Sequence, residues 1–197
     1  MNTPIKPLAF TSPYAWLFWA VFFWVYLPEF GLIARARPEP GQAPDRSMTL
    51  IMIAGWIGFP FAFIVADWSR FILLRGQRAW FALGLTLLLL GSWLRRHCWR
   101  MLGLYFTGNV KVVADQPVIQ QGAYRWVRHP SYTGGMLMYL GTGLALTNWL
   151  SAMIVTGMGA AGYAYRVRVE ERALATALGE EYRDYMRRTK RFVPFVF

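Results

Sequence analysis

The chain has 197 residues, of which 56% are hydrophobic, 17% aromatic and only 16% charged, with a formal net charge of +11. Soluble domains carry about a quarter charged residues, so this composition argues against a water-soluble globular protein and excludes a disordered chain. One cysteine, Cys98, and two histidines exclude both an internal disulfide and a Cys/His metal cage, so we expect no metal site.

Three apolar runs come first along the chain, at residues 14–33, 49–66 and 79–94. Each reaches or approaches the roughly 20 residues that a helix needs to cross a bilayer. We therefore predict three membrane-spanning helices and treat residues 1–94 as a membrane scaffold. Glu29 lies at the end of one of these runs, where a carboxylate at the level of the lipid headgroups is ordinary.

Two further apolar stretches, residues 131–146 and 150–165, are separated only by Thr147, Asn148 and Trp149. So short a connection predicts a helical hairpin. Each arm of 16 residues would be about 24 Å long, so the hairpin either crosses a thinned bilayer or stops short of the far side. The fold class we predict is an all-α membrane protein with about five membrane-spanning helices.

The polar segments of the second half are predicted to lie outside the membrane. Residues 95–130 form a long polar loop in this interpretation. The last membrane helix should continue beyond Tyr165 and stop at Gly179, a typical helix C-terminal residue. A short amphipathic helix over residues 180–188 follows as a cytosolic tail.

The basic residues predict the orientation, because Lys and Arg that flank membrane spans concentrate on the cytoplasmic side. With five crossings and the N-terminus outside, 17 of the 21 Lys and Arg residues fall inside and 4 outside. We therefore expect the C-terminus in the cytosol, and the net charge needs no nucleic-acid partner. The short chain and the lack of a recognisable sorting tail favour a bacterial inner membrane.

A first candidate site lies where the hairpin begins. Arg128 and His129 precede Pro130, which is typical of the first helical position. A helix N-terminus favours negative charge, so these residues could bind a carboxylate or a phosphate. The alternative is that they are the basic flank of a membrane span.

A second candidate site lies where the last membrane helix leaves the bilayer. Glu170 and Glu171 are adjacent, so their side chains point about 100° apart on a helix and only one can share a given face. Arg166 lies one turn before Glu170. The carboxylates could bind a cation such as an amine or a sulfonium, and the alternative is a solvated ion pair. S-adenosylmethionine would satisfy both sites with one molecule.

Two glycines in the first hairpin arm, Gly141 and Gly143, give a weaker signal. They could leave room for a ligand along the hairpin. The alternative is close packing between membrane helices, which small residues permit.

At these residues the sequence resembles the isoprenylcysteine carboxyl methyltransferase and phospholipid methyltransferase superfamily of integral membrane enzymes. The resemblance consists of five short patterns in order: Gly-x-Tyr-x-x-x-Arg-His-Pro-x-Tyr-x-Gly, Gly-x-Gly, Arg-x-x-x-Glu-Glu-x-x-Leu, Leu-Gly-x-x-Tyr-x-x-Tyr and a closing Pro-Phe, within residues 122–197.

The resemblance implies an S-adenosylmethionine-dependent methyltransferase with an opening between helices for a lipophilic acceptor, and it makes residues 95–197 the cofactor-binding, catalytic part. It implies catalytic roles for Arg166 and Glu170, with Arg166 also near the acceptor. The cofactor-binding residues that it implies are Tyr124, Arg128, His129, Tyr132, Gly141, Gly143, Glu170 and Glu171.

The identity of the acceptor stays open at this point. A carboxylate acceptor would be oriented by Arg166 and would need no base. An amine or a thiol would need a base, for which Glu170 and Glu171 are the candidates. Two other protein classes also remain: a steroid-reductase-like membrane enzyme that uses NADPH, and a non-catalytic membrane scaffold or permease. The oligomeric state is not predicted.

Overall fold

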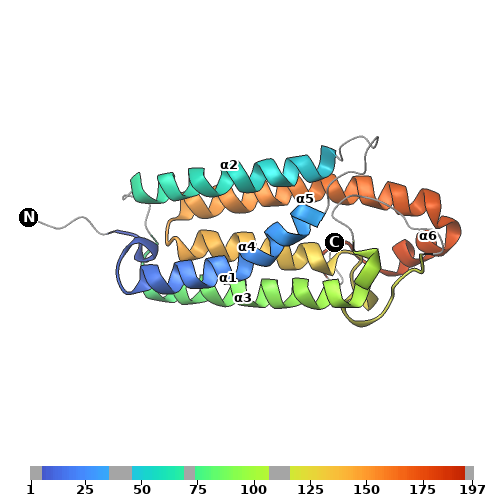
Figure 1. The fold of residues 1–197 in the computed structure, drawn as a ribbon, viewed down its shortest axis with the longest axis horizontal. Helices are drawn as coiled ribbons and strands as arrows, with labels where there is room; N and C mark the ends of the chain where they lie inside the picture. Colours follow the sequence, from blue (N-terminus) through green and yellow to red (C-terminus); the bar gives the residue numbers. More distant parts are fainter. Residues whose placement is uncertain (1–5, 36–45, 69–73, 107–115, 194–197) are drawn as a thin grey trace, which may run out of the picture.

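The computed structural model describes residues 6–35, 46–68, 74–106 and 116–193, and within these ranges the regular secondary structure is helical. The long helices of these ranges run along one axis (Figure 1). These are α1 (Tyr14–Arg35), α2 (Arg46–Trp68), α3 (Gln77–Leu102), α4 (Pro130–Ala145) and α5 (Trp149–Ala177). A short helix, α6 (Gly179–Arg188), follows, and three 3-10 turns are η1 (Leu8–Phe10), η3 (Gly103–Tyr105) and η4 (Gly122–Arg125).

The all-α fold class is confirmed, and every predicted helix is present, although α3 extends eight residues beyond its expected end at residue 94. Among the described helices, α2 is the one that is long and apolar enough to qualify as a membrane span by length and composition. Helix α4 has only 16 residues, and the C-terminal parts of α3 and α5 are rich in charged residues. The count of five crossings therefore stays a prediction.

The predicted polar loop after residue 94 is wrong in its first part, because α3 continues to Leu102. Cys98 is fully buried, so one face of this helical extension still packs against the protein although its sequence is polar. The helix ends at Gly103, whose φ of 53° is a left-handed value that suits glycine. Residues 107–115 of the predicted loop lie outside the described ranges.

The hairpin between α4 and α5 is confirmed. Its tip is held by Asn148, whose side chain accepts a hydrogen bond of 3.1 Å from the amide of Ser151 at the start of α5. The hydroxyl of Ser151 donates to the carbonyl of Ala62 in α2, 2.8 Å away. At the other end of α5, Gly179 has a φ of 61° and lets the chain turn into α6, as the sequence predicted.

Glycines bring α4 into close contact with α3 and with α5, and Gly141 and Gly143 take part in this packing. A Cβ at Gly141 would lie 2.6 Å from the carbonyl oxygen of Gly84 in α3. A Cβ at Gly143 would lie 2.5 Å from the Cα of Ala152 in α5. Both glycines therefore serve helix packing, the alternative that we left open.

The helix α1 is attached through aromatic rings and one ion pair. Phe22 of α1 packs edge to face on Phe59 and Phe63 of α2, with centroids 5.6 and 5.8 Å away. Near the end of α1, Glu29 accepts two hydrogen bonds, of 2.6 and 2.7 Å, from the guanidinium of Arg95 in α3. This bidentate pair fixes α1 to the helix that leads toward the candidate site.

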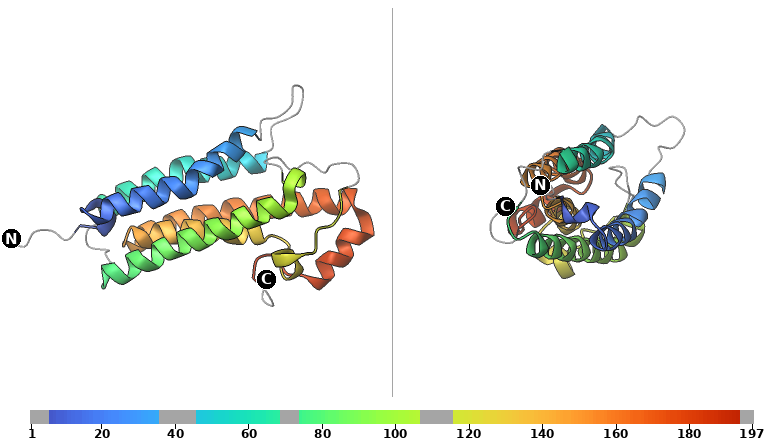
Figure 2. Two further views of the ribbon diagram at one scale, coloured as in Figure 1. Left: turned by 60° about the horizontal axis from the view of Figure 1, so that its bottom comes forward. Right: turned by 90° about the vertical axis from the view of Figure 1, so that its left-hand side faces the viewer.

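The candidate residues gather at one end of the bundle. Helix α6 folds back at the end where α1, α3 and α5 finish and where α2 and α4 begin, and α1 starts at the opposite end (Figure 1). Figure 2 shows the same end from another side, with η4 and α6 lying beside each other below the last turns of α5. We call this end the site end.

Candidate functional site

The foot of α4 is organised around His129, the residue just before the helix. Pro130 occupies the first helical position, as predicted, and the carbonyl of His129 accepts hydrogen bonds from the amides of Tyr132 and Thr133, at 3.0 and 3.1 Å. The imidazole is buried and stacks on the ring of Tyr132, with centroids 5.5 Å apart. A basic side chain that merely flanked a membrane span would not be enclosed in this way.

The C-terminal tail binds the foot of α4 from the outside. We call residues 189–192 the tail strap. The amides of Arg128 and His129 donate to the carbonyls of Lys190 and Arg191, at 2.7 and 3.0 Å. The hydroxyl of Thr133 donates to the carbonyl of Phe192 at 2.8 Å. The strap therefore makes a short parallel pairing with the segment that precedes α4.

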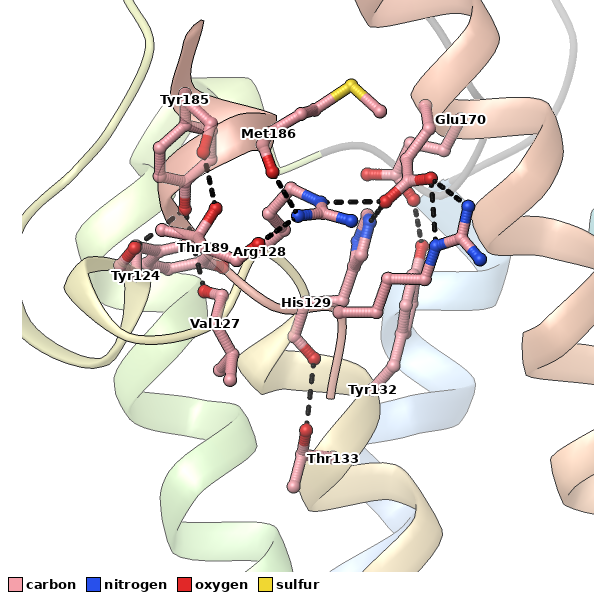
Figure 3. Close-up of polar contacts among 12 residues, drawn as sticks. Tyr124, Val127, Arg128, His129, Tyr132, Thr133, Glu170, Tyr185, Met186 and Thr189 are labelled. Carbon is pink, nitrogen blue, oxygen red and sulfur yellow. Dashed lines mark hydrogen bonds and ion pairs between the residues drawn. The ribbon is translucent and has the colours of Figure 1, made fainter. Parts of the chain in front are cut away.

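Arg128 joins this strap to α5 and α6. Figure 3 shows its guanidinium between the carbonyls of Met186 and Thr189. Its Nε donates to the carboxylate of Glu171 at 2.8 Å. Because three separate segments meet on one guanidinium, Arg128 has a positioning role in addition to any contact with a ligand.

Glu171 lies behind the site rather than in it. Its carboxylate accepts hydrogen bonds from Arg128 and from Nε and Nη2 of Arg191, at 3.0 and 2.9 Å, and lies 3.3 Å from Nε2 of His129. Burial alone would raise the pKa of Glu171, but the hydrogen bonds from His129, Arg191 and Arg128 outweigh it and lower the pKa to about 2. The carboxylate is therefore ionised and already neutralised by its neighbours.

Glu170 points the other way, toward Tyr132 (Figure 3). The hydroxyl of Tyr132 donates to Glu170 at 2.5 Å and accepts from Nε of Arg166 at 2.8 Å. Arg166 is 4% exposed, and its Nη1 donates to the hydroxyl of Ser47 at the start of α2, 3.2 Å away. Tyr132 thus links an acidic and a basic side chain from the same face of α5.

A pocket of about 870 Å³, its open mouth included, lies at the site end; we call it the end pocket. Its wall combines a carboxylate, two arginines and a histidine with several aromatic rings. The lining residues are Leu102, Tyr105, Phe106, Gln116, Pro117, Val118, Ile119, Tyr124, Arg128, His129, Ser131, Tyr132, Arg166, Glu170, Leu174, Leu178, Tyr182 and Tyr185. Burial raises the pKa of Tyr124 and of Tyr182, so both phenols stay neutral.

A second pocket of about 1250 Å³, its opening included, lies between α1, α2, α4 and α5; we call it the interhelical pocket. Most of its wall is apolar, and the ion pair of Glu29 and Arg95 forms part of the wall. The lining residues are Phe22, Tyr26, Glu29, Phe30, Met48, Ile51, Met52, Gly55, Trp56, Phe59, Pro60, Phe63, Arg95, Phe106, Tyr132, Gly135, Met138, Tyr139, Tyr163 and Arg166.

The two pockets share three lining residues, Phe106, Tyr132 and Arg166. A ligand in the end pocket and another in the interhelical pocket would therefore meet at the Tyr132 hydroxyl and the Arg166 guanidinium. This arrangement suits a transfer between a polar molecule that enters from the site end and a lipophilic one that enters from between the helices.

The structure brings most of the predicted site residues together. Six of them line the end pocket: Tyr124, Arg128, His129, Tyr132, Arg166 and Glu170. Glu171, Gly141 and Gly143 do not line this pocket, so their cofactor roles stay predictions from the resemblance. Glu171 does not line the pocket because adjacent side chains on a helix point about 100° apart, so only Glu170 lies on the face of α5 toward the pocket.

Several residues of the site were missed. Tyr182 and Tyr185 line the end pocket from α6, and their spacing of three on an amphipathic helix could have placed them on one buried face. Arg191 was missed because nothing local in the sequence pairs the tail with α5. Within the described residues, no group of three or more His, Cys, Asp or Glu side chains could hold a metal ion.

A comparison with protein families gives a match for residues 82–176, to the model described as the isoprenylcysteine carboxyl methyltransferase (ICMT) family. Protein-S-isoprenylcysteine O-methyltransferase B of Arabidopsis thaliana is 33% identical over 115 residues, which are 57% of this chain and 58% of that protein. Protein-S-isoprenylcysteine O-methyltransferase of Saccharomyces cerevisiae is 34% identical over 116 residues, which are 58% of this chain and 48% of that protein.

The fold is also similar to that of a solved structure, the eukaryotic intramembrane Ras methyltransferase ICMT, with a TM-score of 0.66 and 24% sequence identity. That alignment covers 91% of this chain and 65% of the other chain. The sequence alignments with the Arabidopsis and yeast relatives cover about half to three fifths of the length of those proteins. These matches confirm the resemblance to the first of the two families named from the motifs.

Proposed function

We propose that this chain, whose residues 82–176 match the model of the isoprenylcysteine carboxyl methyltransferase family, is an integral membrane methyltransferase of that family. It transfers a methyl group from S-adenosylmethionine to the carboxylate of a lipophilic, isoprenylcysteine-like acceptor. The observation that carries this proposal is the meeting of the end pocket and the interhelical pocket at Tyr132 and Arg166.

The residues of the end pocket fit S-adenosylmethionine. Glu170 offers a carboxylate for a positive group, and Arg128 and His129 stand at a helix N-terminus that favours a carboxylate. Aromatic rings such as Tyr182 and Tyr105 offer faces for a planar base. When bound, S-adenosylmethionine would supply the methyl group as an electrophile carried on a sulfonium.

The interhelical pocket fits the acceptor. Its apolar wall suits a lipid chain, and Arg166 at its junction with the end pocket can orient a carboxylate through paired hydrogen bonds. A carboxylate carries no proton to remove, so this reaction needs no base. Were the acceptor an amine or a thiol, Glu170 would have to take the proton, because Glu171 does not line the pocket and is held by Arg128 and Arg191.

The protein's contribution in this account is positioning and the exclusion of water. Tyr132 holds the guanidinium of Arg166 by accepting from its Nε, and Glu170 holds Tyr132 in turn. The buried position of Arg166 strengthens its attraction for a carboxylate relative to water. The tail strap covers the site near His129, whose amide donates a hydrogen bond to the carbonyl of Arg191.

The proposed orientation places the end pocket in the cytosol, as the distribution of basic residues predicts. The relatives named above are eukaryotic, so the bacterial inner membrane stays a prediction from the sequence. The acceptor in this proposal is a lipophilic small molecule or a lipid-modified molecule.

The test is a calorimetric titration of the detergent-purified protein with S-adenosylhomocysteine, and with NADPH in parallel. We expect saturable binding of S-adenosylhomocysteine that weakens about tenfold in Glu170→Gln and is unchanged in Glu181→Gln, an exposed carboxylate on α6. Binding of NADPH alone would contradict the proposal and move the protein to the reductases. Binding of neither ligand would favour a non-catalytic scaffold.

A further inference from the structure

Four tyrosines line the otherwise largely apolar interhelical pocket. Tyr26 comes from α1, Tyr132 and Tyr139 from α4, and Tyr163 from α5, and each is at most 9% exposed. A phenol places one hydroxyl, which can both donate and accept a hydrogen bond, at the end of a large apolar ring. Besides the charged groups of Glu29, Arg95 and Arg166, the pocket wall therefore contains four phenol hydroxyls.

Two of these hydroxyls have partners in the protein. Tyr26 shares a hydrogen bond of 3.1 Å with the hydroxyl of Thr142, and Tyr132 is held between Glu170 and Arg166. The hydroxyls of Tyr139 and Tyr163 make no hydrogen bond to any residue in the described ranges. Neither oxygen is among the fully buried polar atoms that lack a partner, and both residues line the pocket.

A glycine keeps the space beside the hydroxyl of Tyr163, and another glycine lies near that of Tyr139. A Cβ at Gly135 would lie 2.1 Å from the Tyr163 oxygen, so only a glycine permits the hydroxyl to stand there. Gly55 of α2 faces the Tyr139 oxygen, which would lie 3.9 Å from a Cβ. The rings of Tyr139 and Tyr163 are neighbours, with centroids 6.0 Å apart. The two hydroxyls therefore form one polar stretch of wall between the helices.

A pure hydrocarbon chain fits this stretch poorly. It would displace water from two hydroxyl groups and offer no hydrogen bond in return, which is unfavourable for each of them. Phenylalanine would fill the same volume without that cost. An occupant that itself carries an oxygen would instead accept hydrogen bonds from the two phenols.

We propose that the acceptor carries a second oxygen function, such as a ketone, an ether or a hydroxyl, in its lipid chain, and that Tyr139 and Tyr163 bind it. This inference rests on the proposed function, because it takes the interhelical pocket as the acceptor site. Tyr163 lies one helical turn from Arg166, and Tyr139 lies seven residues, or about 10 Å, along α4 from Tyr132. The oxygen therefore lies about 5–10 Å from the methyl-accepting group.

The experiment compares S-alkyl cysteine acceptors of equal chain length, one with an all-carbon chain and others with a ketone moved stepwise along it. Both methyl transfer and direct binding, the latter by thermal stabilisation, are measured for each probe. For the wild-type protein we expect one ketone position to improve binding and kcat/KM about tenfold over the all-carbon probe.

The variants are Tyr139→Phe and Tyr163→Phe, with Tyr165→Phe as the matched control because Tyr165 is exposed on the same helix as Tyr163. Each of the first two should abolish the preference for the ketone probe, and the control should keep it. Equal affinity of the wild-type protein for all probes would overturn the inference. The inference would also be overturned if both variants bound the all-carbon probe more tightly than the wild type does and kept the wild-type affinity for the ketone probe.

The outcome for the proposed function is read separately. If no probe is methylated, the proposed function fails, while the ratio of binding affinities still decides whether the two tyrosines bind a lipid oxygen. If probes are methylated at equal rates and bound with equal affinity, the proposed function stands and this inference falls.

Discussion

The hydroxyl of Tyr132 lies 2.8 Å from Nε of Arg166, and this contact joins the foot of α4 to the inner face of α5. Both residues line the end pocket and the interhelical pocket. Arg166 therefore has a fixed orientation at the one place where ligands of the two pockets can meet.

Tyr132→Phe should lower kcat about tenfold to hundredfold, because a hydrogen bond to a charged side chain is lost and Arg166 is no longer held toward the acceptor. The affinity for S-adenosylhomocysteine should change much less than kcat. Initial rates and calorimetry on the same preparation check this. A variant that loses affinity but keeps kcat would place Tyr132 in cofactor binding alone.

Glu171→Gln should destabilise the protein by about 3 kcal/mol, because it removes the charge that neutralises buried Arg128 and its neighbours. Binding of S-adenosylhomocysteine should weaken only as a consequence. Thermal unfolding in detergent measures the first effect, with Glu180→Gln on the exposed face of α6 as the control. Unchanged stability together with lost affinity would show that Glu171 contacts the ligand itself.

The same carboxylate predicts a loss of stability in acid. Its pKa is lowered to about 2 from an ordinary value of 4.5, so its contribution to stability is fully present above pH 4.5 and is lost as the pH falls toward 2. The difference in melting temperature between wild type and Glu171→Gln should therefore shrink across this interval. A difference that stays constant from pH 5 to about pH 2 would contradict the assignment.

The helices were predictable because long apolar runs and a three-residue hairpin tip leave few alternatives. Six residues of the end pocket were also predicted, from the short patterns of the resemblance. The contacts between distant segments were not predictable. The apolar run ends at Leu94, so the sequence predicted the end of α3 there. The helix continues through Arg95, which pairs with Glu29, a residue 66 positions away in the sequence. Glu170 lines the end pocket, whereas Glu171 binds Arg128 and Arg191 outside it. The two residues are adjacent in the sequence and differ in the helix face on which they lie. The glycine at position 141 indicated that another group comes close to the helix, but the sequence did not distinguish a neighbouring helix from a ligand.

Gly141→Ala should destabilise the protein by about 1–3 kcal/mol, because the added Cβ would lie 2.6 Å from the Gly84 carbonyl oxygen and 2.7 Å from the Leu88 amide, which are backbone atoms that cannot move aside. Gly157→Ala is the matched control, since nothing lies within 4 Å of a Cβ there. Melting temperatures of both variants check this. An unchanged melting temperature with weaker cofactor binding in Gly141→Ala would restore the ligand role.

Glu29→Ala should destabilise the attachment of α1 by about 3 kcal/mol, because it leaves the partly buried guanidinium of Arg95 without its carboxylate. The double variant with Arg95→Met should recover much of this loss. A double-mutant cycle of unfolding free energies measures the coupling. Strictly additive effects of the two substitutions would mean that the pair contributes nothing to stability.

The most direct test of the central claim is methyl transfer from labelled S-adenosylmethionine to an S-prenyl cysteine probe. It compares the wild-type protein with Arg166→Ala and with Arg168→Ala, an exposed arginine on the same helix. We expect label in the acceptor for the wild type and for Arg168→Ala, and a loss of about a hundredfold or more in Arg166→Ala with nearly unchanged affinity for S-adenosylhomocysteine. Equal rates for Arg166→Ala and the wild type would contradict the account.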